Sequence, residues 1–447
     1  MRNDIRKYLR RLVTAAVTPA VLTAGVAGCG QLLDQAAPSR VLEETLQGAA
    51  AAKLLVDGAR AGFGCAFQAY VTGMGLVSDE LEDNQLAAAG WDWDRRSMLP
   101  IGGNFATAAC DGTQQFGLYT PLQTARYTAD LALANLKTFT DAEVTGRVGL
   151  IATAALFSAY SHVLLGEGFC TAAVDGGPEL QPKQVFELAE ARFGEAIAAA
   201  TTANNSALLN AALVGRARTR LNLAKLPGQA VVNAKLTEAR ADAALVPAGF
   251  KYDIPYNTAA TYARNMVAVR AREGLLYGVA PRYRNMTFAN VPDPRVVVTA
   301  SPGRGQDNLS NNVFFPGKYT GQNSPITLAR YQEARLIMAE ADYHLVGPTS
   351  AVAYINALHT AVNLPAFNSA DPTEILNQLI EERSRELFLE SHRAYDINRF
   401  NLPLFPAAGT PFMDPNPNGA TRNKGGTYGT VRCLPLPDVE RDNNPNL

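Results

Sequence analysis

Apolar positions recur every three or four residues along most of the chain, which predicts a mostly α-helical protein. Segment 148–165 is apolar on nearly every side, so we expect this helix to lie buried in the core. The other predicted helices cover residues 41–60, 122–136, 184–200, 207–223, 230–245, 258–272, 327–345, 349–362 and 372–391.

Small residues occupy positions where paired helices would cross, such as Ala154, Gly215 and Ala339. Ala-rich antiparallel hairpins of this length resemble tetratricopeptide-type repeats, although insertions separate the pairs. A single hairpin cannot bury its apolar face alone, so we expect the hairpins to stack into one scaffold. The chain is long enough for one large core, and we interpret residues 41–447 as a single helical domain.

Three stretches interrupt this helical pattern. Residues 62–120 are Gly-rich, residues 275–325 contain repeated prolines, and residues 401–447 are rich in Pro, Asn and Gly. Within the second stretch, segments 296–298 and 313–315 are predicted short strands. The sequence therefore predicts a less regular, loop-rich lobe beside the helical scaffold, in which residues 62–120 and 275–325 are candidates for a ligand-binding surface and 401–447 wraps the surface.

The first 28 residues have the order of an export signal: basic residues, then an apolar stretch, then small residues. The sequence Val26-Ala27-Gly28-Cys29 resembles a bacterial lipobox, in which the cysteine is acylated and becomes the mature N-terminus. We therefore predict a lipoprotein signal peptide at 1–28 and a lipidated tether at 29–40. Acyl chains on Cys29 would hold the protein at a membrane surface. The alternative is an N-terminal membrane helix, for which the apolar run is short.

Charge and cysteine content narrow the possible functions. The chain has 40 Lys and Arg residues against 41 Asp and Glu residues, so it lacks the basic excess of a nucleic-acid-binding protein. Besides Cys29 the chain contains Cys65, Cys110, Cys170 and Cys433. In an exported chain these four predict two disulfides, with three possible pairings, and the alternative is four buried thiols.

The sequence contains no G-x-S-x-G, H-E-x-x-H or Walker-type motif, so we expect no cofactor and no metal site. Glu382 and Glu386 lie four residues apart on one predicted helical face, and a carboxylate pair could cleave a glycosidic bond. Arginines nearby would keep both carboxylates ionised, which does not suit a general acid. We favour a structural ion-pair network for these residues.

The positive signal for ligand binding is a polar stretch that contains both tryptophans, Trp91 and Trp93. Sugars stack their C–H faces on aromatic rings, while charged side chains such as Asp94 and Arg95 bind their hydroxyls. If the stretch is extended, the two tryptophans share a face. The alternative is that one or both fill the core. Tyr283 is a second, weaker candidate in the Pro-rich region.

Four segments together resemble the SusD/RagB-like family of outer-membrane nutrient-binding lipoproteins. They are the lipobox at Cys29, the helix 147–165 with its turn 166–169, the block 329–341 with 351–364 and 380–400, and the end 434–447. The block 380–400 is the most specific, and it departs from the family pattern at Ser391, where glycine is usual. In order and spacing the resemblance covers almost the whole mature chain.

The resemblance implies a lipid-anchored, surface-exposed protein of the outer membrane that is not an enzyme. It implies capture of a nutrient, a glycan or oligosaccharide, and delivery to a SusC-like TonB-dependent transporter. Two alternatives stay open from the sequence: a glycoside hydrolase on a helical scaffold, and a lipoprotein scaffold that binds only protein partners.

Overall fold

The computed structural model describes residues 48–86, 90–307, 312–414 and 422–447. The chain divides into two units, 1–48 and 49–447, and the second is the folded body described below. The predicted signal peptide 1–28, Cys29 and the tether 29–40 lie outside the described residues. These assignments therefore stay predictions.

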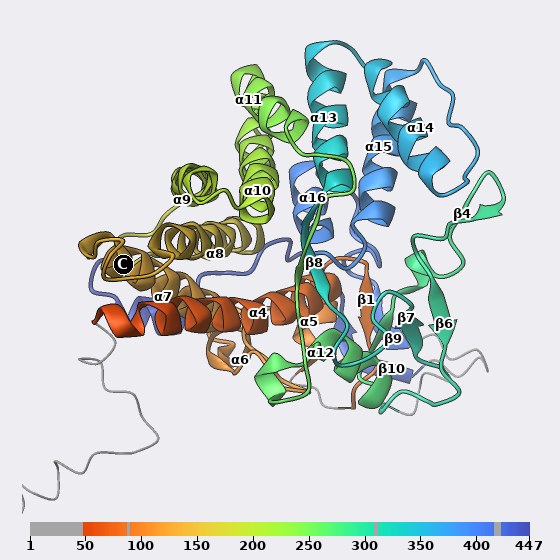
Figure 1. Cartoon of the computed structure of the whole chain (residues 1–447). Coiled ribbons are helices and arrows are strands. Elements are labelled where there is room, and N and C mark those ends of the chain that lie inside the picture. The colour runs from red at the N-terminus through yellow and green to blue at the C-terminus, as the bar shows by residue number, and fades with distance from the viewer. Residues whose placement is uncertain (1–47, 87–89, 308–311, 415–421) are drawn as a thin grey trace, which may run out of the picture. The chain divides into compact units, whose positions relative to one another are not determined.

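A series of long helices forms the scaffold, as the apolar pattern predicts. They are α4 (Ala52–Val77), α7 (Tyr119–Thr138), α8 (Arg147–Gly168), α9 (Pro182–Thr202), α10 (Ser206–Ala224), α11 (Asn233–Ala244), α13 (Tyr331–Leu345), α14 (Ser350–Ala361) and α15 (Pro372–Glu386). Each packs against the next in this order, so that hairpins follow one another through the body (Figure 1). The mostly α fold is therefore confirmed, and the likeness to tetratricopeptide repeats stays an interpretation.

Local capping explains where several of these helices begin. Helix α9 starts with a capping box, in which Gln181 and Gln184 exchange side-chain-to-backbone hydrogen bonds, and Pro182 takes the first helical position. Asp371 caps α15 by accepting a hydrogen bond from the Glu374 N–H, at 2.9 Å. These contacts satisfy backbone N–H groups that a helix start leaves without partners.

Helix α8 is the buried centre of the scaffold. It packs against α4, α7, α9 and α10. By length and composition it could cross a membrane, but 72% of its most apolar window is buried inside the body, as in the core helix of a globular domain. Close packing next to α8 depends on Gly215 of α10. A Cβ atom there would come within 2.3 Å of the Phe193 ring and 2.9 Å of the Tyr160 ring.

The irregular lobe contains short antiparallel strand pairs. In the described residues these pairs are β1 (Leu81–Asp83) with β3 (Tyr277–Val279), β2 (Lys251–Ile254) with β8 (Ile326–Arg330), β4 (Thr287–Phe288) with β5 (Val291–Pro292), β6 (Val298–Ala300) with β7 (Phe314–Pro316), and β9 (Pro411–Asp414) with β10 (Arg422–Thr427). Most of them lie at one end of the scaffold, away from α9 (Figure 1). Short helices complete the lobe and the C-terminal region: α5 (Asp92–Arg95), α6 (Gly103–Thr107), α12 (Met266–Ala268), α16 (Arg393–Arg399) and α17 (Asp438–Asn443).

Two predicted boundaries are wrong. Residues 62–77, expected to be irregular, are the second half of α4, and tertiary packing explains why glycines are tolerated there. A Cβ at Gly73 would lie 2.8 Å from the Trp93 ring, so the glycine lets Trp93 pack directly on the helix. The expected helix 258–272 is broken into a 3-10 turn, α12 and a π-helical turn. The expected strands near 296–298 and 313–315 exist, displaced by one or two residues.

Two disulfides pair the four cysteines. Cys65 of α4 bonds Cys110, with a Cα–Cα distance of 5.6 Å. Cys170, just after α8, bonds Cys433 near the C-terminus, with a Cα–Cα distance of 5.1 Å. The first ties the segment before α7 to α4, and the second holds the C-terminal segment against the end of α8.

The turn after α15 explains one feature of the most specific sequence block. Ser391 has a φ angle of +74°, in the left-handed region that glycine adopts most easily. The serine has hydrogen-bond partners in this conformation, because its hydroxyl and carbonyl oxygens both accept from Arg218, each at 3.3 Å. The serine in place of the usual glycine therefore adds hydrogen bonds with Arg218 and keeps the left-handed backbone of the turn.

Candidate functional site

One cavity of about 400 Å³ lies in the irregular lobe, where segments far apart in the sequence meet. Its walls come from the turn after α4, from β1, from α5, from residues 280–281 and from the C-terminal segment that contains β9 and β10. Figure 1 shows β1, α5, β9 and β10 at the same end of the body. The lining residues are Ser78, Asp79, Leu81, Glu82, Asp83, Asn84, Asp94, Ala280, Pro281, Phe405, Pro406, Thr410, Pro411, Phe412, Lys424 and Tyr428.

Helix α5 separates the two tryptophans instead of aligning them. Trp91 and Trp93 sit at the start of a helical turn, where residues two apart point in different directions. Trp93 is 2% exposed and stacks on Phe116 with ring centroids 5.0 Å apart. The prediction that both rings share one ligand face is therefore wrong, and Trp93 belongs to the core.

Trp91 and Arg95 lie instead against the C-terminal hairpin. The Trp91 ring is tilted against Phe412, with centroids 6.1 Å apart, and its Nε1–H donates to the Gln85 carbonyl at 3.0 Å. The Arg95 guanidinium lies 5.9 Å from the Phe412 centroid and donates to the Gly425 carbonyl at 3.2 Å. Both predicted residues therefore support an aromatic wall of the cavity, to which Phe412 belongs.

Asp94 lines the cavity itself, next to a second buried carboxyl group. The backbone N–H of Asp83 donates to Asp94 Oδ2 at 2.8 Å. Gln85 donates to both carboxylate oxygens of Asp83, at 2.7 Å from its backbone and 2.9 Å from its side chain. The Lys424 ammonium lies 2.7 Å from Asp307 and 3.9 Å from Asp83. Strand β10 thus places the Lys424 ammonium near Asp83 of β1. The two carboxyl groups, Asp83 of β1 and Asp94 of α5, are called the floor of the cavity.

Burial dominates the electrostatics of this floor. It raises the pKa of Asp83 to about 7, against the lowering effect of Lys424 and the bonds from Gln85. Burial likewise raises the pKa of Asp94 to about 7, although the hydrogen bond from Asp83 lowers it. Both groups titrate near neutral pH, so the charge of the cavity changes there.

Tyr283 does not reach the cavity, although Ala280 and Pro281 shortly before it do. Its ring is fully buried and stacks on Phe388, with centroids 4.7 Å apart. Its hydroxyl lies 2.6 Å from Ser384 Oγ. The prediction of Tyr283 as a ligand contact is wrong, because the side chain packs against the segment that follows α15.

Sequence reasoning missed the contributions of β1 and of the C-terminal hairpin. Asp83, Phe405, Phe412, Lys424 and Tyr428 all line the cavity. The tail gave no periodic signal, because its strands are short and separated by Pro, Gly and Asn residues. Single aromatic and charged residues in such a segment become informative only when the fold places them beside β1 and α5.

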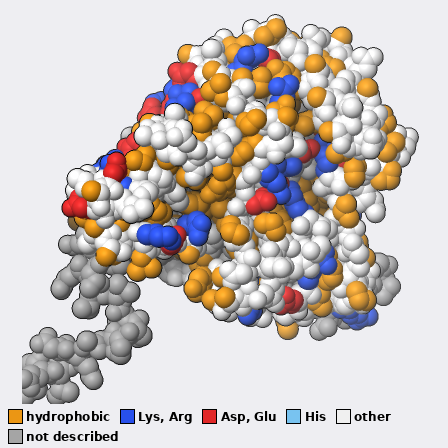
Figure 2. All heavy atoms as spheres, viewed as in Figure 1, with side chains coloured by type: hydrophobic (Ala, Val, Ile, Leu, Met, Phe, Trp, Pro, Cys, Tyr) orange, Lys and Arg blue, Asp and Glu red, His pale blue; other side chains and the backbone are white. Residues whose placement is uncertain are grey.

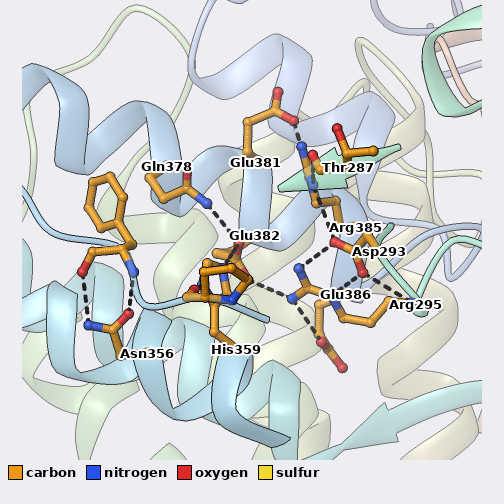
Figure 3. A network of polar contacts seen from close by, with 12 residues as sticks. Thr287, Asp293, Arg295, Asn356, His359, Gln378, Glu381, Glu382, Arg385 and Glu386 are labelled. Carbon is orange, nitrogen blue, oxygen red and sulfur yellow. Dashed lines mark hydrogen bonds and ion pairs between the residues drawn. The ribbon is translucent and has the colours of Figure 1, made fainter. Parts of the chain in front are cut away.

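Glu382 and Glu386 lie in a different environment, which Figure 3 shows from close by. Glu382 Oε1 lies 2.8 Å from His359 Nε2 and accepts from Gln378 Nε2 at 2.8 Å. Arg295 donates to Glu382 at 2.5 Å and to Glu386 at 3.3 Å. Both carboxylates are buried. Although burial raises it, the pKa of Glu382 lies below its usual value because His359 and Arg295 hold the ionised form.

Other arginines extend this network to neighbouring segments. Arg330 at the end of β8 pairs with Glu386 at 2.9 Å and with Glu390 at 3.0 Å. Arg385 pairs with Asp293 at 3.2 Å, just after the β4–β5 hairpin (Figure 3). The residues therefore fix the irregular lobe to α15, as the ion-pair interpretation predicts. A glycosidase pair needs two carboxyls open to one bond, and these two face arginines.

Charged residues on the scaffold form ion pairs that join neighbouring helices. Arg220 pairs with Glu190 and Asp242, each at 2.8 Å, and Lys235 pairs with Glu190 at 2.9 Å. Figure 2 shows blue and red side chains next to one another along the edge that α9 and α11 form. Across the described part of the chain, no group of three or more His, Cys, Asp or Glu residues is arranged to hold a metal ion.

The fold and the cavity define a helical scaffold protein with an irregular lobe that contains a cavity. Residues 312–447 match the model of the SusD family. A curated relative, SusD-like protein P2 of Formosa agariphila, is 36% identical over 131 residues, which are 26% of this chain and 24% of that protein. The chain thus aligns with about a quarter of that relative's length.

Solved structures extend the likeness to most of the body. A SusD superfamily protein from Parabacteroides distasonis has a TM-score of 0.63 at 13% identity, and the alignment covers 91% of this chain and 99% of that one. A SusD-like carbohydrate-binding protein from Bacteroides vulgatus has a TM-score of 0.62 at 14% identity, covering 90% and 97%. The resemblance to the SusD family is therefore confirmed by the family model over residues 312–447, and the solved structures show the same fold over most of the chain.

Proposed function

We propose that this protein is a carbohydrate-binding lipoprotein of the cell envelope that takes a glycan or oligosaccharide into the cavity between β1, α5 and the β9–β10 hairpin. The cavity combines exposed aromatic surface with buried carboxyl groups. Phe405 is 48% exposed at its wall, and Asp83 and Asp94 form its floor. This combination carries the proposal, because sugar rings stack on aromatic faces while carboxylates accept their hydroxyl hydrogens.

The volume is consistent with a small saccharide. A cavity of about 400 Å³ falls in the range of ligand pockets, which hold molecules of a few hundred daltons. A disaccharide or the end of a longer chain would fit, with the remainder of the chain outside. The likeness to a SusD-like carbohydrate-binding protein from Bacteroides vulgatus supports the same ligand class.

The proposal includes an anchor and a partner. Cys29 would carry acyl chains that hold the protein, with its folded body surface-exposed, at the outer membrane. The stacked helices would offer a rigid face to a SusC-like TonB-dependent transporter, which receives the captured sugar. Labelling with palmitate in the native host should be lost in Cys29→Ser, and the transporter should co-purify with the wild-type protein. An unlabelled wild-type protein would contradict the anchor.

We propose binding without hydrolysis. The one carboxylate pair that the sequence suggested for cleavage, Glu382 and Glu386, is buried and paired with Arg295 and Arg330. Incubation of the purified protein with each bound glycan should leave the glycan intact. Product release that Glu382→Gln abolishes, in a folded variant, would favour the hydrolase instead.

A glycan panel tests the site directly. The wild-type protein should bind at least one oligosaccharide, and Phe405→Ala and Trp91→Ala should each weaken that binding about tenfold, because both remove aromatic surface at or beside the cavity. Tyr127→Ala is the matched control, since Tyr127 is 54% exposed on α7 and does not line the cavity. Undiminished binding in both cavity variants would refute the site.

A further inference from the structure

We propose that the cavity selects uncharged sugars and rejects glycans that carry carboxylates or sulfates, with Asp94 as the residue that enforces this choice. The proposal rests on the proposed function and names the substrate class of the same site. It follows from the charges that the cavity presents to a ligand.

The lining of the cavity is mostly apolar, but its charged residues are mainly acidic. They are Asp79, Glu82, Asp83 and Asp94, against one cation, Lys424. The Lys424 side chain is only 4% exposed, and its ammonium already contacts Asp307 and the Asp83 carbonyl. Because Lys424 already has these partners, an incoming anion would find no cation of the lining available to pair with it.

The neighbouring arginines are committed to partners behind the wall. Arg393 makes a two-point contact with Asp79, at 2.7 Å for both hydrogen bonds, and Arg284 pairs with Glu82. Arg96 lies over the Tyr428 ring, 4.9 Å from its centroid, and donates to backbone carbonyls. None of these three arginines belongs to the cavity lining. Arg393 and Arg284 offset the charges of Asp79 and Glu82, which leaves Asp83 and Asp94 as the lining acids with the least compensation.

Asp94 differs from the other lining acids. Asp79, Glu82 and Asp83 each have a cationic neighbour within 4 Å, whereas no Lys, Arg or His of the described chain forms an ion pair with Asp94. Within the described chain its direct hydrogen-bond donor is the Asp83 N–H. A carboxyl with spare acceptor capacity at a cavity wall is suited to a ligand hydroxyl. An anionic group in the same place would be buried beside it without compensation, which excludes such ligands.

The pKa values of Asp83 and Asp94 support the rejection of anionic sugars and make this rejection depend on pH. The charged and titratable groups around Asp94 are Asp83, Lys424, Arg96, Tyr277 and Tyr428, and Asp83 has Asp307 as a further neighbour. Burial raises the pKa of both Asp83 and Asp94 to about 7, so both lose protons as the pH rises from 6 to 8.5. The floor becomes more negative over that interval. Rejection of anionic sugars should therefore strengthen with rising pH.

The experiment compares matched glycans on the purified protein. A panel with equal numbers of neutral and anionic oligosaccharides identifies the best ligand by calorimetry at pH 8. Oligogalacturonate and the same oligomer after reduction of its carboxylates to primary alcohols form one pair, which differs only in charge. The best neutral ligand and its form with primary hydroxyls oxidised to carboxylates give a second pair.

We expect the neutral member of a binding pair to bind at least tenfold more tightly. Asp94→Asn keeps the shape of the side chain and should reduce that ratio to about threefold or less, while Asp175→Asn, an exposed acid that does not line the cavity, leaves it unchanged. Equal or tighter binding of the anionic members by the wild-type protein overturns the proposal. An unchanged ratio in a folded Asp94→Asn variant removes Asp94 as its cause. Failure to bind any member refutes the proposed function instead.

Discussion

Two groups of buried carboxylates have different partners, and from this difference we infer different roles for them, one structural and one in ligand binding. On α15, Glu382 and Glu386 meet Arg295, Arg330 and a histidine, and every contact joins one chain segment to another. In the cavity, Asp83 and Asp94 are as well buried, but within the described residues their one ion pair is the 3.9 Å contact of Asp83 with Lys424. We interpret the first group as stabilising the fold and propose the second as the group available to a ligand.

The difference appears in the direction of the pKa shifts. Arginine and histidine partners hold the pKa of Glu382 below its usual value, in spite of burial. The pKa of Asp94 rises to about 7, because burial is opposed mainly by a backbone hydrogen bond. Burial alone therefore says little about the role of a carboxylate. The partners that satisfy it decide the role.

The largest expected effect comes from breaking the α15 network. Arg295→Ala removes one cationic partner from Asp293, Glu382 and Glu386 at once. It should lower the free energy of unfolding by about 3–5 kcal/mol, since three buried carboxylates each lose part of their charge compensation. Urea denaturation measures the loss. As a control, Arg147→Ala breaks a pair with the exposed Asp141 and should cost about 1 kcal/mol or less. Equal losses in both variants would contradict the structural role of the network.

A smaller effect distinguishes the two groups by isosteric replacement. Glu382→Gln should lower the free energy of unfolding by about 1–3 kcal/mol, because Arg295 loses a charged partner. Asp94→Asn should change it by about 0.5 kcal/mol or less, because no ion pair is lost. The same denaturation series measures both. A larger loss of stability in Asp94→Asn than in Glu382→Gln would contradict the assignment of Glu382 to the fold and of Asp94 to the ligand.

The smallest effect is a change in stability with pH. Burial raises the pKa of Glu80 to about 8, and the cavity acids lie at about 7, so the folded protein binds protons above pH 4.5 that the unfolded chain does not. Stability therefore falls as the pH rises through the folded pKa values. The melting temperature should drop by about 3 °C between pH 6.5 and 9.

The α15 network provides the internal control for that pH scan. Glu382 and Asp396 have lowered pKa values, so their stabilising contribution is present throughout pH 6.5–9 and is lost only in acid, below pH 4.5. Glu80→Gln should flatten the alkaline decline. A melting temperature that rises from pH 6.5 to 9 would contradict the raised pKa values of the buried acids.

The sequence predicted the scaffold better than the site, for a physical reason. Helices such as α7 and α15 repeat an apolar stripe over about four turns or more, and local periodicity is enough to locate them. The cavity depends on contacts between α5, β1 and residues of the C-terminal hairpin, which are more than 300 positions apart. Trp93 illustrates the limit: its burial, its stacking on Phe116 and the close approach at Gly73 depend on segments that only the fold brings together.

The most direct test of the account is a crystal structure of the protein with its best neutral oligosaccharide. The account predicts a sugar ring against Phe405 and a ligand hydroxyl within about 3 Å of an Asp94 carboxylate oxygen. A saccharide bound elsewhere on the body, with the cavity beside Asp94 empty, would contradict it.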